Sequence, residues 1–167
     1  SEDRNDFLET YLVSKSRFMI CSNYGANELA VIFRRKRLML DFFDFSSIKE
    51  QNLFLTPMIL PKIFYHLNNN FELTFEEAFI KKLYYIHRIE HLNELGYGLR
   101  DNSERQIEQA IINFDMIINN KLDQDKIYNE QIFFWNAVKK YFAYENKYKT
   151  ILCPSFFDNN NKLFKFV

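Results

Sequence analysis

A tight turn near the start of the chain carries the residues best suited to bind an anion. The turn begins with Ser22 and Asn23 and contains Gly25, which can adopt a backbone conformation that other residues resist. Asn27 and Glu28 follow and open an apolar-periodic helix. Backbone N–H groups at a helix start attract phosphate, small side chains let a diphosphate approach, and Glu28 can accept hydrogen bonds from ribose or sugar hydroxyls. These five residues therefore form a candidate phosphate-binding loop.

A purely structural interpretation of the same loop stays open. Gly25 alone can account for the turn, while Asn27 and Glu28 suit the positive end of a helix dipole without any ligand. A single glycine is also a much weaker signature than a complete phosphate-binding loop with several glycines and a lysine.

A pair of histidines offers a second kind of chemistry. His87, Glu90 and His91 match the pattern H-x-x-E-H of inverted zinc proteases. On one helix the two histidines would share a face, which is the spacing that a common zinc ion requires. A third protein ligand is needed, and the nominal candidates are Glu104, Glu108 and Glu130. The alternative is two solvent-facing histidines without a metal.

Further polar residues take their meaning from the apolar runs that they follow. The basic run 34–37 ends the helix that follows the turn, roughly 13 Å from the N-terminus of that helix. It is therefore expected to lie at the edge of the sheet opposite the turn, as a basic corner exposed to solvent. Attraction to a membrane surface is the functional alternative. Lys62 follows the third apolar run and can neutralise phosphate, and Asn102 can contact a ligand at the edge where the strands end. Both residues also suit ordinary roles, as a surface lysine and as a residue before a helix start.

Alternating strands and helices would position these residues. The apolar runs 17–21 and 38–42 predict two adjacent parallel strands, and Thr74 with Glu77 and Ser103 with Gln106 form capping boxes of two later helices. The other expected elements are a first helix with Phe7, Leu8, Tyr11 and Leu12 on one face, an apolar run at 53–56 interrupted by Pro57 and Pro61, helices at 84–95 and 130–144, and a brief edge strand at 96–100. The predicted fold class is α/β, with three layers and a parallel sheet of roughly 4–5 strands. Phe33, Phe114 and Phe134 are expected to be buried on that sheet.

Composition limits the classes of partner. The 167 residues predict a single domain over 1–167. Lys plus Arg and Asp plus Glu number 22 each, so no overall charge favours nucleic acid. Cys21 and Cys153 lie far apart in apolar surroundings, which indicates buried thiols in a reducing cytoplasm. No apolar run reaches the ~18 residues of a membrane span, and the absence of an initial Met suggests a piece of a longer protein.

The segment DFLETYLVSKSRFMICSNYGANELAVIFRRKRLMLDF resembles the carboxyl-terminal half of a family of glycosyltransferases from bacterial surface-polysaccharide gene clusters. The shared features are the leading Asp-Phe-Leu, the strand that ends in a glycine turn, and the short helix before the next strand. LFLTPMILPKIF, LTFEEAF and LGYGLRDNSERQIEQAI extend the resemblance in order, and SFFDNNNKLF is similar to the end of such proteins. Tyr24 departs from the small residue that is usual in the turn.

The resemblance implies a two-domain GT-B glycosyltransferase, of which this chain is the Rossmann-like, nucleotide-sugar-binding half. The implied donor site consists of Ser22, Asn23, Gly25, Asn27, Glu28, Lys62 and Asn102, with no catalytic residue assigned and neither a cofactor nor a metal. The implied partners are a nucleotide-sugar donor and a missing amino-terminal domain, or a second copy that binds through an apolar edge around Phe156, Phe157 and Phe164. The expected location is the cytoplasm, with peripheral contact to the inner membrane. Two other functions stay open: a zinc-dependent hydrolase that uses His87, Glu90 and His91, and a non-catalytic α/β interaction module.

Overall fold

The computed structural model describes residues 5–22, 27–49 and 53–166. Its centre is a parallel sheet with the strand order β1-β2-β3-β6. The strands are β1 (Phe18–Cys21), β2 (Lys36–Phe42), β3 (Met58–Pro61) and β6 (Ile151–Leu152). The strands expected at 17–21 and 38–42 are adjacent and parallel, with Ile20 paired to Leu38. The α/β class and the first strand pair are therefore confirmed.

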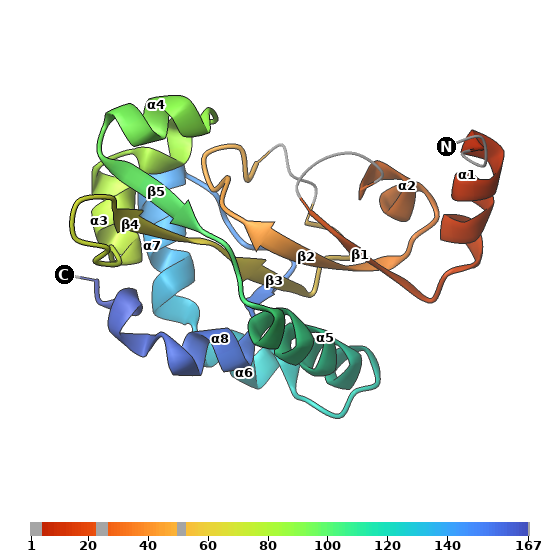
Figure 1. Cartoon of the computed structure of the whole chain (residues 1–167). Coiled ribbons are helices and arrows are strands. Elements are labelled where there is room, and N and C mark those ends of the chain that lie inside the picture. The colour runs from red at the N-terminus through yellow and green to blue at the C-terminus, as the bar shows by residue number, and fades with distance from the viewer. Residues whose placement is uncertain (1–4, 23–26, 50–52, 167) are drawn as a thin grey trace.

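Helices pack on both sides of this sheet. In Figure 1, α2 (Asn27–Ile32) lies above the strands and α5 (Glu104–Ile118) lies below them. Both predicted capping boxes are present, at Thr74 with Glu77 and at Ser103 with Gln106. The remaining helical elements are α1 (Asp6–Lys15), α3 (Phe75–Ile80), η1 (Leu83–Tyr85), α4 (Ile89–Glu94), α6 (Gln124–Glu130), α7 (Ile132–Phe142), α8 (Pro154–Asn159) and η2 (Asn161–Phe164). Within the described ranges, no helix is both long enough and apolar enough to cross a bilayer.

Two prolines border the third strand and do not interrupt it. The apolar run at 53–56 precedes β3, which begins directly after Pro57 and ends at Pro61. The carbonyl of Pro57 accepts a hydrogen bond from the N–H of Ile151, and the N–H of Lys62 donates to the carbonyl of Phe42, both at 2.9 Å. The hydrogen-bond ladder therefore bypasses the two missing N–H donors.

A second sheet, which the sequence did not predict, continues from the end of β3. Its strands β4 (Ile63–His66) and β5 (Tyr97–Arg100) pair in antiparallel fashion. The strand expected at 96–100 is therefore real, but it does not lie at the edge of the parallel sheet. Only Lys62 separates β3 from β4, so one extended stretch of chain leaves the first sheet and enters the second.

The prediction of one helical segment over 84–95 is wrong. The chain forms the short turn η1 and then the separate helix α4, and Lys82 before them adopts a left-handed backbone conformation with φ of 56°. Tyr84 is buried, with its ring edge-on to the rings of Phe64 and Phe45. The packing of Tyr84 in the core thus overrides the helical pattern of the local sequence.

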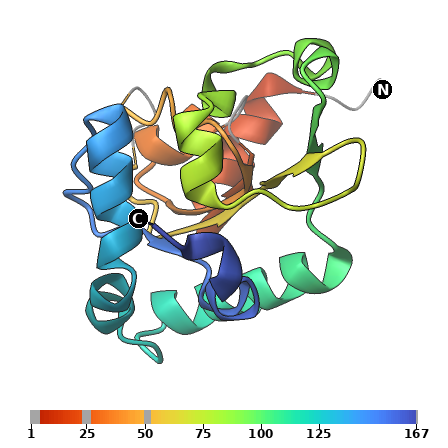
Figure 2. The same cartoon turned by 90° about the vertical axis from the view of Figure 1, so that its left-hand side faces the viewer.

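An aromatic cluster fills the space between the second sheet, α3, α7 and the loop after β2. Figure 2 shows α3 and α7 side by side on the face that covers this cluster. Phe45 has its ring centroid 4.9 Å from that of Phe42 and 5.7 Å from that of Phe134. Phe114 and Phe134 are buried as predicted, whereas Phe33 is only half-buried. The reason is that α2 ends at Ile32, so that Phe33 lies in the following turn.

The end of the chain packs within the domain, which contradicts the predicted apolar edge around Phe156, Phe157 and Phe164. Phe156 and Phe164 are buried, and Phe157 is half-buried against the core. Helix α8 and turn η2 return the chain toward α3, where the ring of Phe164 stacks on that of Phe75 at 4.7 Å. These phenylalanines therefore complete the core and leave no patch for a partner.

The basic run 34–37 forms the expected solvated corner only in part, because Arg34 and Lys36 are exposed whereas the other two arginines are not. The run begins in the turn after α2 and continues into β2. Arg37 is 1% exposed, and its Nη2 donates to the carbonyl of Phe54 at 3.2 Å. Arg35 donates to the carbonyl of Ser14. The sequence pattern missed this division because an arginine in a strand resembles one at a helix end when only charge is considered.

Candidate functional site

Lys62 and Asp101 form an ion pair where the two sheets join. Lys62 lies between β3 and β4, and Asp101 directly follows β5. Ile63 is paired with Arg100 in an antiparallel register. Lys62, which precedes Ile63, therefore lies beside Asp101, which follows Arg100. Lys62 Nζ lies 2.6 Å from Asp101 Oδ1. The pairing of β4 with β5 therefore fixes this contact.

Asn102 completes the same cluster and connects it to the end of β2. Its Nδ2 donates to Asp41 Oδ1 at 2.8 Å and more weakly to the carbonyl of Pro61 at 3.4 Å. Asp41 has a φ of 53°, at a point where the register of β2 against β3 shifts between Met39 and Phe42. Aspartate tolerates this left-handed conformation better than most residues, and such outliers occur preferentially at functional sites.

The carboxyl edge cluster, defined as Asp41, Lys62, Asp101 and Asn102, therefore joins side chains from the end of β2, from the link between β3 and β4, and from the segment after β5. Sequence reasoning identified Lys62 and Asn102 but missed the two aspartates. Asp41 follows the apolar residues Leu38–Leu40 near the end of β2, which is the position where parallel strands present side chains to ligands. That position was the available signal for Asp41, whereas Asp101 follows Arg100 at the end of an antiparallel strand and carried no such signal.

Lys62 determines the electrostatics of this cluster. Its hydrogen bond and positive charge hold the pKa of the Asp101 carboxyl below the ordinary value. The side chain of Lys62 is 19% exposed and that of Asp101 is 86% exposed. The ammonium group is therefore partly shielded while its partner carboxylate is free to move into solvent.

The predicted phosphate-binding loop is only partly described. Asn23 and Gly25, with Tyr24 between them, lie outside the described residues. Ser22 directly follows β1 and is exposed, Asn27 begins α2, and Glu28 is exposed in the first turn of that helix. Ser22 and Lys62 follow strands that are two positions apart in the sheet, a separation of about 10 Å at the ordinary strand spacing. They therefore share an edge without belonging to one contact cluster.

Asp44 lies in the loop after β2 and contacts one of the predicted histidines. Its buried carboxylate accepts hydrogen bonds from Ser46 Oγ at 2.8 Å, from the N–H of Ser47 at 3.1 Å and from Ser47 Oγ. His87 Nδ1 lies 3.9 Å from Asp44 Oδ2. Sequence reasoning missed Asp44, because nothing in a polar loop distinguishes this carboxylate from its neighbours.

The predicted zinc geometry is wrong in its spacing. Helix α4 begins at Ile89, so His87 precedes the helix and does not share a helical face with His91. In the described part of the chain, no group of three or more His, Cys, Asp or Glu side chains is arranged to hold a metal ion. The H-x-x-E-H pattern therefore has no structural counterpart here.

The two cysteines form no disulfide, and their environment disfavours nucleophilic chemistry. Burial raises the pKa of the Cys21 thiol to about 11. Burial also raises the pKa of Cys153, against hydrogen bonds from Ser155 and the backbone that lower it. Both thiols are consequently protonated at neutral pH, and a protonated thiol is a poor nucleophile.

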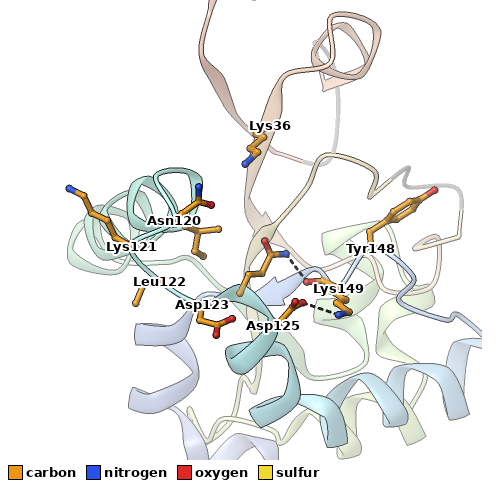
Figure 3. A pocket seen from close by; sticks show the side chains of 10 residues that line it. Lys36, Asn120, Lys121, Leu122, Asp123, Asp125, Tyr148 and Lys149 are labelled. Atoms are coloured by element: carbon orange, nitrogen blue, oxygen red, sulfur yellow. Dashed lines mark hydrogen bonds and ion pairs between the residues drawn. The ribbon is translucent and has the colours of Figure 1, made fainter.

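A polar cavity of about 660 Å³ lies at the opposite, amino edge of the sheet (Figure 3). Lys36 at the start of β2 borders it, together with Asp125 and Lys149, whose Nζ and Oδ1 atoms are 2.9 Å apart. Gln124 Nε2 donates to the carbonyl of Lys149 at 2.8 Å. None of the residues predicted to bind a donor lines this cavity. The cavity therefore lies at the amino edge of the sheet, whereas the predicted donor-binding residues lie at the carboxyl edge.

Comparisons of the chain with protein-family models, with curated proteins and with solved structures found no match.

Proposed function

We propose that this chain is the nucleotide-sugar-binding domain of a glycosyltransferase that acts in bacterial surface-polysaccharide biosynthesis. The observation that carries the proposal is the carboxyl edge cluster, where Lys62 and Asn102 meet Asp41 and Asp101. Ligands of open α/β sheets bind outside the carboxyl ends of the strands. The sequence resemblance to glycosyltransferases of such gene clusters supplies the substrate class.

The cluster has the groups that a sugar nucleotide requires. The ammonium of Lys62 can neutralise a phosphate, and the carboxylate of Asp41 and the amide of Asn102 can exchange their mutual hydrogen bond for bonds to hydroxyl groups. Helix α2 has only 6 residues, so its dipole contributes less than that of a long helix. The proposal therefore assigns Lys62 the larger share of phosphate affinity.

Titration calorimetry of the whole chain with UDP, GDP and CMP tests this assignment. Replacing Lys62 by Gln removes the charge with little change in volume and is expected to weaken binding at least about tenfold, since a hydrogen bond to a charged group is worth about 1.5 kcal/mol or more. Lys121→Gln at the opposite edge is the matched control and is expected to change affinity less than about twofold.

Three results would contradict the proposal. They are binding that Lys62→Gln leaves unchanged, binding that Lys121→Gln weakens more than Lys62→Gln, and no binding of any nucleotide. The last result would favour a non-catalytic interaction module. The proposed role implies a cytoplasmic protein that works near the inner membrane, together with an amino-terminal domain that supplies the acceptor site.

A further inference from the structure

A small polar pocket lies between α5 and α8, next to the carboxyl edge cluster. It has a volume of about 190 Å³ and is lined by the beginning of α5 and by α8, which lie side by side below the sheet in Figure 1. Ser103 lines this pocket and directly follows Asn102, whose Nδ2 donates to Asp41 Oδ1. The pocket therefore adjoins the cluster that contains Lys62.

The lining of this pocket is rich in carboxamide groups, each of which can both donate and accept hydrogen bonds. The residues that supply them are Gln106, Gln109, Asn159 and Asn160. Among the described residues that line the pocket, Arg105 carries the one charge and none is acidic. The one ring in the lining belongs to Phe156, which is 2% exposed. The pocket therefore offers hydrogen-bonding groups on several sides and no exposed ring for stacking.

Two of these carboxamides are held in place by contacts within the chain. Gln106 Oε1 accepts hydrogen bonds from the N–H of Ser103 at 2.8 Å and from Ser103 Oγ at 3.0 Å. Asn160 Nδ2 donates to the carbonyl of Phe156 at 2.8 Å. These bonds leave the Nε2 group of Gln106 to donate to a ligand and the Oδ1 atom of Asn160 to accept from one. Gln109 is half-buried, and within the described ranges its side-chain amide has no hydrogen-bond partner, so a ligand can supply one.

A sugar ring fits this pocket better than a nucleobase does. Proteins bind bases by stacking them on exposed side chains as well as by hydrogen bonds, and this lining offers no exposed ring. The hydroxyl groups of a sugar each donate and accept, as carboxamides do. Pockets for whole ligand molecules usually measure roughly 300–1,000 Å³. A volume of about 190 Å³ therefore suits one ring of a larger ligand.

We propose that the pocket between α5 and α8 receives the sugar ring of the donor and that Gln109 contributes to its selection. The inference rests on the proposed nucleotide-sugar function of the carboxyl edge cluster. In a nucleotide sugar, the sugar is bonded directly to a phosphate group, so a sugar pocket must adjoin the residue that neutralises the phosphate. The chain meets this requirement, because Ser103 of the pocket follows Asn102 of the cluster that contains Lys62.

Titration calorimetry of the whole chain compares UDP-glucose with UDP, GDP-mannose with GDP, and CMP-N-acetylneuraminate with CMP. The sugar is expected to increase the affinity in at least one pair, which is then used for the variants. Gln109→Leu removes the amide with little change in volume. It is expected to weaken binding of the nucleotide sugar about threefold to tenfold and binding of the nucleotide less than about twofold. Asn159→Ala changes an exposed residue on the opposite wall and is expected to act in the same direction, whereas Lys62→Gln is expected to weaken both ligands.

Gln124→Leu is the matched control, because Gln124 is also a half-buried glutamine but lies at the amino edge of the sheet. It is expected to leave both affinities unchanged, and circular dichroism checks that each variant is folded. Three results would overturn the inference and leave the proposed function standing: nucleotides that bind without any gain from the sugar, a gain that survives both Gln109→Leu and Asn159→Ala, and an equal loss for nucleotide and nucleotide sugar in Gln109→Leu. A chain that binds none of the six ligands would overturn the inference and the proposed function together.

Discussion

Two phenylalanines at opposite ends of the molecule show how little residue type says about burial. Phe45 belongs to a loop after β2 and is completely buried, whereas Phe7 belongs to a helix and is 76% exposed. Phe45 touches rings from α3, η1 and α7, elements that are distant in sequence. Phe7 has its ring contact within its own helix, with Tyr11 at 6.3 Å. The neighbours that the fold brings together therefore decide which aromatic residue stabilises it.

The two outer strands of the parallel sheet, β1 and β6, differ in a similar way. At one edge, the side-chain amide of Gln131 pairs with both backbone groups of Leu152 in β6, accepting from its N–H at 2.8 Å and donating to its carbonyl at 3.0 Å. Gln131 thus acts as one residue of an additional strand. On the other side, β1 is the edge strand and leaves Ile20 exposed. The β6 side of the sheet is therefore closed by its own chain, whereas the β1 side leaves an apolar side chain in solvent.

The largest effect is expected from Phe45→Ala. Removing this ring leaves a cavity among several aromatic side chains, and the free energy of unfolding is expected to fall by about 3–5 kcal/mol. Urea denaturation followed by circular dichroism measures it. Phe71→Ala, at a position that is 69% exposed, is the control. A loss below about 1 kcal/mol for Phe45→Ala would mean that the aromatic cluster does not carry the stability of this region.

Gln131→Ala is expected to have the next largest effect. The change leaves the N–H and the carbonyl of Leu152 buried without these partners, and each such group costs about 1–3 kcal/mol. The expected loss in the free energy of unfolding is therefore at least about 2 kcal/mol. Gln124→Ala is the matched control, since Gln124 also bonds a backbone carbonyl but at the surface. Equal losses in the two variants would show that the edge of β6 is not closed by Gln131.

Local sequence patterns predicted the parts of the fold that depend on short-range interactions. The capping boxes at Thr74 and Ser103 and the parallel pairing of β1 with β2 needed only neighbouring residues or one crossover. The break of the helical pattern near Tyr84 and the burial of Phe45 depend on residues that are distant in sequence. The antiparallel second sheet could not be predicted either, because no turn signature joins β4 to β5.

The candidate site shows the same division. Lys62 was identified because it follows an apolar run, and Asn102 because it lies between a predicted strand and a helix cap, but their shared cluster required the pairing of β4 with β5. Asp41 could have been identified from its position after an apolar stretch, but its positive φ, at the register shift of β2 against β3, could not have been predicted from local sequence. The H-x-x-E-H pattern misled because the spacing has meaning only within one continuous helix, and α4 starts too late to include His87.

The ion pair between the two sheets is expected to have a small, pH-dependent effect. Lys62 lowers the pKa of Asp101 in the folded protein, so the pair stabilises above the ordinary carboxyl pKa and the contribution is lost as the pH falls through the lowered value. Lys62→Gln is expected to raise the pKa of Asp101 toward that of an unpaired aspartate and to cost at most about 1 kcal/mol at neutral pH. Carboxyl carbon NMR titration of both proteins measures the shift. An unchanged pKa of Asp101 would mean that Lys62 and Asp101 do not form this ion pair in solution.

The smallest effect is expected from Phe7→Ala, which repeats the chemistry of Phe45→Ala at the opposite end of the molecule. The free energy of unfolding, measured by urea denaturation, is expected to change by less than about 0.5 kcal/mol, because an exposed ring loses little contact when it is truncated. A large loss of stability would instead mean that α1 packs its apolar face onto its own domain in solution, which would remove the difference between the two ends.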